Sequence, residues 1–203
     1  MRRIYLFGDI NSERTEKFIA QLHELFEESC DPVTVFINSC GGSVTDALAI
    51  YDLLRNAPCE IHTVALGKVH SAAITALLAA RRENRSSYPN TEFMSHDISW
   101  KSDGPRAFLR DRVDQLERTV RQLLEVYTLD TNLSQEEARV LFFVDMADHY
   151  FTPQEALEMG FISKIISRED GRAAGIVQNE PAMVEPVNII QEEETLAINS
   201  SRD

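Results

Sequence analysis

The sequence predicts an α/β protein built from repeated strand and helix units. Short runs rich in β-branched and aromatic residues alternate with longer runs typical of helices, as in proteins with a parallel sheet. The chain has 203 residues, of which 43% are hydrophobic, enough to form one substantial core. The expected elements are strand 3–7, helix 13–28, strand 33–39, helix 44–55, strand 61–66 and helix 72–82.

Local signals support these elements in turn. The run 33–39 reads as a buried strand, and Ser43 suits an N-cap for the helix at 44–55. The apolar run at 61–66 ends at Gly67, and a run of small helix formers begins a few residues later. The sequence therefore places two strand-to-helix junctions close together in the chain.

The second half of the chain has a different pattern. An extended stretch at 92–97 follows a turn at 89–90, and a polar connector at 99–105 leads into a long helix from about 106 to 128. An apolar stripe along this helix needs a partner surface, which is either the core of the protein or another subunit. The residues of the stripe are Phe108, Val113, Leu116, Val120, Leu123, Leu124 and Tyr127.

Charge and cysteine usage exclude several classes of function. The net charge of −13 argues against a nucleic-acid partner, because a phosphate backbone would be repelled. Three cysteines, at 30, 40 and 59, form neither a disulfide framework nor a CxxC pair, which favours a reducing compartment and predicts a cytoplasmic protein. The longest apolar run, 72–80, is too short to span a bilayer, and no metal site or cofactor is indicated.

Ser71 is the first candidate catalytic residue. It lies where an apolar strand gives way to a helix, so a sharp turn would point its hydroxyl away from the sheet. Free N–H groups at the start of the following helix would stabilise a developing oxyanion. The simpler interpretation is that Ser71 is only a helix N-cap.

Two further segments add candidates. Gly41 and Gly42 follow the strand 33–39, and paired glycines let the backbone approach a bound peptide closely, although they also suit an ordinary tight turn. His96 lies near the end of the stretch at 92–97 and is a candidate general base among five histidines. Cys40 precedes the glycines, either as an oxidation-sensitive thiol or as a small buried side chain.

Four segments together resemble the Clp protease proteolytic subunit family. They are Ile37 to Ser43, Gly67 to Ser71, Met94 to His96, and Asp148 to Gly160, in the order and spacing of that family, and the similarity covers roughly residues 4 to 167. The resemblance implies the fold shared by Clp peptidases and crotonases. It also implies a peptidase domain at 1–167 with a protruding handle at about 99–132. The glycines, prolines and acidic run of residues 168–203 predict a flexible tail after that domain.

The resemblance also implies residue roles. Ser71 would be the nucleophile, His96 the general base and Asp148 the carboxylate that orients the histidine, with Asp145 as the second choice. The backbone N–H groups of Gly42 and Ala72 would form the oxyanion hole. The backbone of Gly41 and Gly42 would also bind the substrate strand.

Assembly follows from the same resemblance. The handle implies a homo-oligomer of stacked rings, expected to be heptameric, whose chamber admits peptides or unfolded proteins. A partner ATPase of the AAA+ class is implied too, but the chain reaches Ile4 almost at once, so the gate loops that usually precede the first strand are expected to be absent.

Two other functions stay open at this point. The chain is either an active serine peptidase, a catalytically silent structural subunit of a Clp-like assembly, or an acyl-CoA enzyme of the crotonase fold. Crotonases also use N–H groups as an oxyanion hole, but their chemistry has no need of a Ser, His and Asp set.

Overall fold

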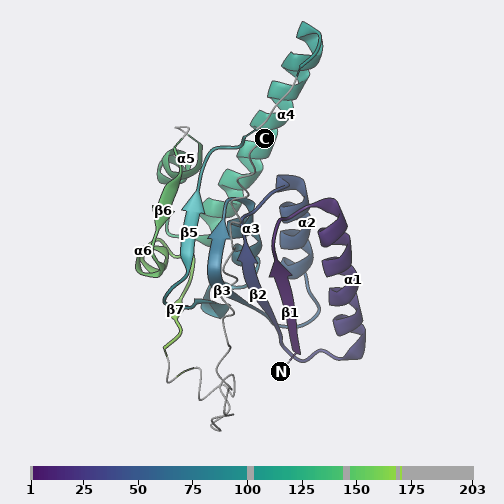
Figure 1. Cartoon of the computed structure of the whole chain (residues 1–203), viewed down its shortest axis with the longest axis vertical. Helices are drawn as coiled ribbons and strands as arrows, with labels where there is room; N and C mark the ends of the chain where they lie inside the picture. Colours follow the sequence, from purple (N-terminus) through teal and green to yellow (C-terminus); the bar gives the residue numbers. More distant parts are fainter. Residues whose placement is uncertain (1, 100–102, 144–146, 168–169, 171–203) are drawn as a thin grey trace, which may run out of the picture. The chain divides into compact units, whose positions relative to one another are not determined.

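The computed structural model describes residues 2–99, 103–143, 147–167 and 170. Three predicted features lie outside the described residues. They are Asp145, part of the connector at 99–105, and the tail at 168–203 apart from Asp170. The α/β class is confirmed, and the described residues form one mixed sheet flanked by helices (Figure 1). Its strands are β1 (Arg2–Phe7), β2 (Val33–Ser39), β3 (Ile61–His70), β4 (Arg85–Ser87), β5 (Glu92–Ser95), β6 (His149–Phe151) and β7 (Lys164–Ile165).

The four predicted helices appear in the expected order, and two more, α5 and α6, follow them among the described residues. They are α1 (Ser12–Glu28), α2 (Val44–Arg55), α3 (Ala72–Leu78), α4 (Arg106–Asp130), α5 (Gln135–Phe143) and α6 (Pro153–Glu158), with a 3-10 turn at Arg82–Asn84. None of these described helices is both long and apolar enough to cross a membrane. Thr152 and Glu155 form a reciprocal capping box that fixes the start of α6.

Strand β3 forks the sheet and thereby creates the region where the candidate residues meet. The sheet runs β1-β2-β3-β4-β7, and β5 pairs with the far end of β3 before pairing with β6. The first half of β3 pairs in parallel with β4, and its second half, Lys68 to His70, pairs in parallel with β5. Because β6 runs antiparallel to β5, a late segment of the chain returns beside the end of β3.

The prediction that the third strand ends at residue 66 was wrong. Gly67 adopts a φ of 67° inside β3, and the register against β2 shifts between Ile37 and Ser39. A glycine with positive φ allows such an irregularity without ending the strand. The strand therefore continues to His70 and delivers Ser71 at its very end.

The predicted helix at 72–82 was too long. Helix α3 ends at Leu78, and a 3-10 turn follows at Arg82–Asn84. Just past the end of the helix, the carbonyl of Ala80 accepts from Nε of the buried Arg85 at 2.8 Å. This side chain thus satisfies a carbonyl that the helix itself does not pair.

The apolar stripe on α4 serves two purposes along its length. Leu123, Leu124 and Tyr127 are buried in the core of the same chain. Phe108 and Val113, nearer the start of the helix, are 42% and 51% exposed. Figure 1 shows this first part of α4 extending beyond the sheet as a protruding helix. Within the described residues these two side chains are only partly covered, Phe108 by the guanidinium of Arg112, whose carbon lies 5.1 Å from the ring centroid.

Candidate active site

Ser71 occupies a strained turn between β3 and α3. Its φ of 53° and ψ of −126° make it the single non-glycine residue with a positive φ in the described part of the chain. Such strain costs free energy and clusters at functional sites. The Ser71 N–H donates to the carbonyl of Met94 at 2.7 Å and ties the turn to β5. A serine held this way has the local geometry of an exposed nucleophile.

The contacts of Ser71 do not support the simpler interpretation as an N-cap. Its hydroxyl makes no capping hydrogen bond to α3. Ser43 at the start of α2 and Thr152 at the start of α6, by contrast, each accept a capping N–H. The Ser71 side chain instead lines a cavity and makes no hydrogen bond within the described residues.

Gly41 packs directly against the Ser71 turn. Its φ is 84°, and a Cβ added there would lie 2.6 Å from the carbonyl oxygen of His70 and 2.9 Å from Cβ of Ser71. These distances are shorter than van der Waals contact and involve backbone atoms that have no room to move. The paired glycines of the sequence therefore bring the loop after β2 to the base of Ser71.

Substituting Gly41→Ala is expected to slow any reaction of the Ser71 hydroxyl by roughly 10- to 100-fold, because the new methyl group displaces the turn. The rate of covalent labelling of Ser71 measures this loss. Gly8→Ala is the matched control: Gly8 has a similar φ of 77°, but its Cβ would meet the flexible side chain of Arg14. An equal loss in both variants would mean that general backbone strain, not displacement of Ser71, causes the effect.

Two backbone N–H groups lie beside the serine. The N–H of Gly42 makes no hydrogen bond within the described residues, and Gly42 belongs to the cavity lining with Ser71 and Ala72. Ala72 is the first residue of α3, so its N–H has no partner inside that helix. Both donors suit an anionic oxygen formed next to the Ser71 hydroxyl.

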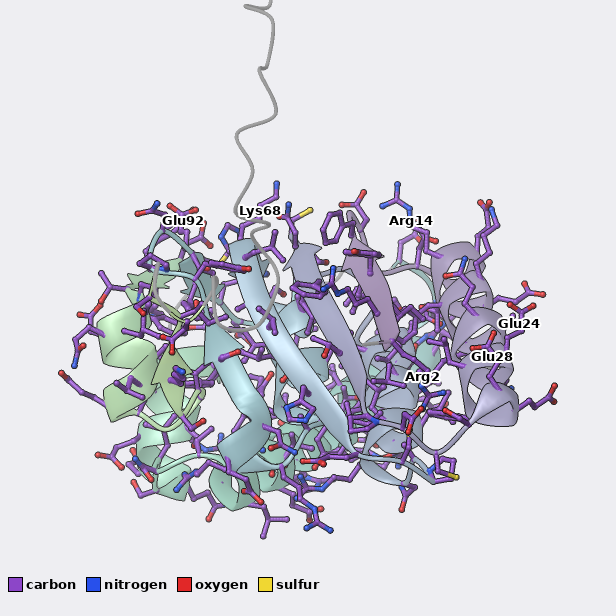
Figure 2. All side chains as sticks on the ribbon, turned by 90° about the horizontal axis from the view of Figure 1, so that it is seen from below. Arg2, Arg14, Glu24, Glu28, Lys68 and Glu92 are labelled. Atoms are coloured by element: carbon purple, nitrogen blue, oxygen red, sulfur yellow. The ribbon has the colours of Figure 1, made fainter. Side chains whose placement is uncertain are left out.

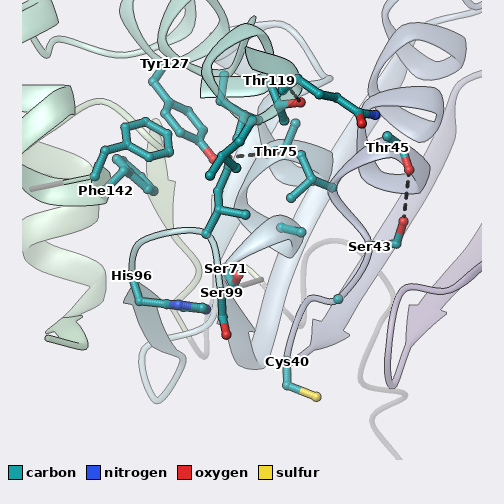
Figure 3. Close-up of a pocket in the computed structure, with 18 of the residues that line it drawn as sticks. Cys40, Ser43, Thr45, Ser71, Thr75, His96, Ser99, Thr119, Tyr127 and Phe142 are labelled. Atoms are coloured by element: carbon teal, nitrogen blue, oxygen red, sulfur yellow. Dashed lines mark hydrogen bonds between the residues drawn. The ribbon is translucent and has the colours of Figure 1, made fainter. Parts of the chain in front are cut away.

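The sheet register brings His96 and Asp148 to the same end of two paired strands. Ser95 of β5 lies opposite His149 of β6 in the last pair of their antiparallel ladder. His96 follows Ser95 and Asp148 precedes His149, so both lie just beyond the paired strands. His96 is half-buried and lines the cavity with Ser71, and Figure 3 shows its ring directed toward Ser71 and Ser99.

The three candidate side chains do not form a connected triad in this conformation. Among the described residues, Ser71, His96 and Asp148 make no hydrogen bond to one another. Asp148 is exposed and outside the cavity lining, and it interacts electrostatically with His70. Catalytic hydrogen bonds in ligand-free sites are often loose and tighten when substrate binds.

The cavity beside Ser71 has a volume of about 560 Å³ and an apolar aromatic wall (Figure 3). Tyr127 of α4 stacks on Phe142 of α5 with ring centroids 4.0 Å apart. The Tyr127 hydroxyl forms a 3.1 Å hydrogen bond with Thr75, and burial raises the pKa of Tyr127 to about 12, so the phenol stays neutral. Such a wall suits an apolar side chain next to the reacting group.

Cys40 differs from the expectation of a small buried side chain, because it is exposed at the cavity rim. Its thiol donates to Oδ1 of Asp9 at 2.8 Å. This hydrogen bond is the main cause that raises the pKa of Cys40. Since the thiolate is the reactive form, Cys40 is less suited to oxidation than an ordinary surface thiol.

Sequence reasoning missed most of the cavity wall. Thr75, Phe142 and Phe143 line the cavity, but α5, which carries both phenylalanines, was not predicted. The signal was present in the sequence as adjacent aromatic residues after the long helix. The sequence indicated Ser71 because the signal for its turn is local. The aromatic wall of the cavity, by contrast, is formed by helices that are distant from that turn in the chain.

Comparisons with known proteins agree on one family. Residues 1–169 match the family model described as Clp protease. The chain is 36% identical over 178 residues to ATP-dependent Clp protease proteolytic subunit 2 of Nocardia farcinica, covering 86% of this chain and 85% of the relative. It is 33% identical over 167 residues to the protein of that name from Thermobifida fusca, covering 82% and 81%.

Solved structures give the same result for the fold. ClpP1 from Listeria monocytogenes matches with a TM-score of 0.73 at 30% sequence identity, over 84% of this chain and 94% of that one. A mutant form of ClpP1 from the same organism matches with a TM-score of 0.73 at 32% identity, over the same shares of the two chains.

Proposed function

This chain belongs to the Clp protease family, and from that premise we propose that it is a serine endopeptidase subunit that cleaves peptides or unfolded proteins through an acyl-enzyme. The observation that carries the proposal is the strained Ser71, whose side chain lines a cavity together with His96 and makes no capping bond. A residue held at a φ of 53° without a structural hydrogen bond from its side chain is best explained by its use as a nucleophile.

The proposed reaction has two halves. Neutral His96 accepts the proton of the Ser71 hydroxyl while the serine oxygen attacks the scissile carbonyl, and the N–H groups of Gly42 and Ala72 stabilise the resulting oxyanion. His96 then gives the proton to the departing amine, which leaves an ester on Ser71. Water, deprotonated by His96, hydrolyses the ester. Asp148 orients His96 and stabilises its protonated form.

Substrate would be bound from two sides. The backbone of Gly42 is exposed beside Ser71 and suits an extended peptide. The same role expected for Gly41 is wrong, because Gly41 is buried, its N–H donates to Oγ of Ser39 and its carbonyl accepts from the N–H of Ile10. The aromatic wall of Tyr127 and Phe142 suits the apolar side chain next to the cleaved bond. The acidic chain favours a protein or peptide substrate over a nucleic acid.

Assembly is part of the proposal. The exposed apolar residues Phe108 and Val113 on the protruding half of α4 support its burial against another subunit, in stacked rings that enclose the cavities. We place the protein in the cytoplasm on its cysteine usage. An AAA+ ATPase is the proposed partner class, although peptides short enough to diffuse into the chamber would be cleaved without it.

Incubation with a fluorophosphonate probe followed by intact-mass measurement tests the proposal. We expect one adduct per chain in the wild-type protein and none in Ser71→Ala, because only an activated serine displaces the leaving group. Ser43→Ala serves as the matched control, since Ser43 also lines the cavity but caps α2. It should label like wild type.

A folded and assembled wild-type protein that acquires no adduct would contradict the peptidase proposal. It would favour instead a catalytically silent subunit of a Clp-like assembly. The lack of hydrogen bonds among Ser71, His96 and Asp148 within the described residues would then reflect an inactive site. Binding of an acyl thioester without labelling of Ser71 would favour the crotonase type of chemistry.

A further inference from the structure

His70 is a buried histidine immediately before the proposed nucleophile, and the proposed mechanism gives it no role. It is 8% exposed, and its Nε2 atom is buried without a hydrogen-bond partner within the described residues. Nε2 nevertheless lies 3.1 Å from Oε1 of Glu92, in a contact that lacks hydrogen-bond geometry. A buried ring nitrogen without a hydrogen bond costs free energy and needs an explanation.

The position of His70 in the sheet connects the three strands that carry the proposed triad. His70 of β3 is paired with Met94 of β5, and Met94 is paired with Tyr150 of β6. The ring of Tyr150 stands edge-on to the His70 imidazole, with centroids 6.1 Å apart and planes at 89°. Toward the same end of the sheet, Ser71 lies one residue beyond this row, and His96 and Asp148 each lie two residues beyond it.

Charged groups surround the imidazole from each of these strands. Lys68 stands on β3, Glu92 on β5, and Asp148 just before β6. Lys68 and Glu92 are paired in the β3 and β5 register, and Figure 2 shows them next to each other at one edge of the sheet. Asp148, the proposed triad carboxylate, interacts electrostatically with His70.

We propose that His70 is a positioning residue whose neutral imidazole leaves Asp148 free to orient His96, and whose protonation draws Asp148 away and disables the site. The inference rests on the proposed function, because it assigns Asp148 to the triad. The physical reason is simple attraction: an imidazolium next to Asp148 competes with His96 for the same carboxylate. Glu92 supplies a second anion that holds the protonated ring in place.

The environment sets the direction of the pH response. Burial lowers the pKa of His70, and the carboxylates of Glu92 and Asp148 partly oppose that effect. His70 is therefore neutral at neutral pH, and the site is competent there. As the pH falls through the pKa of His70, the ring gains a proton and the site loses its oriented His96.

The rate of fluorophosphonate labelling of Ser71 between about pH 5 and pH 8 tests this inference. Protonation of the base His96 alone gives a logarithmic acid limb with a slope of about 1. If His70 must also be neutral, the slope approaches about 2 at the acid end. In His70→Gln, which cannot titrate, we expect a slope of about 1 throughout.

Glu92→Gln provides a second, directional readout that does not remove the histidine. Loss of this carboxylate removes an interaction that raises the pKa of His70, so the steep part of the acid limb should move to lower pH.

The size of the effect is measured by comparing the wild-type protein with His70→Gln. One pH unit below the pKa of His70, the labelling rate of the wild type should have fallen by roughly tenfold more than that of His70→Gln.

His62→Gln is the matched control. His62 lies on the same strand, and its Nε2 is 3.4 Å from Oε1 of Glu60, but it stands at the opposite end of β3 from Ser71. Its pH profile should coincide with that of wild type. A wild-type slope of about 1, unchanged in His70→Gln, would overturn the inference and leave the proposed function standing. Absence of labelling in wild type at every pH would overturn both.

Discussion

Replacing His96 with alanine is expected to lower peptide cleavage by roughly 10⁴- to 10⁶-fold, nearly as much as Ser71→Ala. Without the imidazole, no group at the cavity accepts the serine proton, and the hydroxyl is a weak nucleophile at neutral pH. Initial rates with a fluorogenic peptide measure the loss. The fold should be intact in both variants, because neither side chain belongs to the buried core.

A double variant shows whether Ser71 and His96 act together or contribute independently to the cleavage rate. Members of a triad act as a unit, so Ser71→Ala combined with His96→Ala should be no slower than Ser71→Ala alone. His23→Ala is the control, because His23 is exposed on α1. Losses that multiply in the double variant, or a His96→Ala variant that keeps most of its activity, would remove His96 from the role of general base.

Replacing Asp130 with alanine is expected to lower the free energy of unfolding by about 3–5 kcal/mol. The side chain of Arg85 is fully buried and that of Asp130 is 4% exposed, and they form an ion pair at 2.8 Å. Burial lowers the pKa of Arg85, which reflects the cost of its charge in the interior, and Asp130 opposes this effect. Removing the carboxylate leaves that charge without compensation.

Two further partners make Asp130 the centre of a network. Tyr51 donates to Oδ2 of Asp130 at 2.6 Å, and Arg55 pairs with Oδ1 at 3.0 Å. Both come from α2, whereas Asp130 is the last residue of α4. The network therefore joins the end of α4 to α2 and to β4. Tyr127, one turn earlier on α4, lines the cavity, so loosening this end should also disturb the proposed substrate pocket.

Urea denaturation followed by far-UV circular dichroism measures the stability effect. Lys17→Ala, which breaks the exposed pair of Lys17 with Glu13 on α1, is the control and should leave the denaturation midpoint unchanged. Asp130→Leu combined with Arg85→Met should be more stable than Asp130→Ala, because an apolar pair removes both buried charges. Equal midpoints for Asp130→Ala and Lys17→Ala would contradict the assignment of a stabilising network.

Patterns within a few residues determined what the sequence predicted well. The strand 33–39 and the helix 44–55 have the bounds expected, since a β-branched run and a serine N-cap act through neighbouring residues. The turn before α3 and the exposure of Ser71 to a cavity follow from the same kind of signal. The α/β class and the family were thus contained in the chain itself.

Pairing between distant segments decided the rest. A register shift beside Gly67 carries β3 on to His70, the antiparallel return of β6 brings Asp148 to the end of the sheet where His96 lies, and the aromatic wall joins α4 to α5. No short stretch of the sequence indicates these contacts, because each depends on which distant strand or helix packs against it. Local sequence patterns identify the candidate reacting residues of a site, and only the tertiary structure determines which side chains lie beside them.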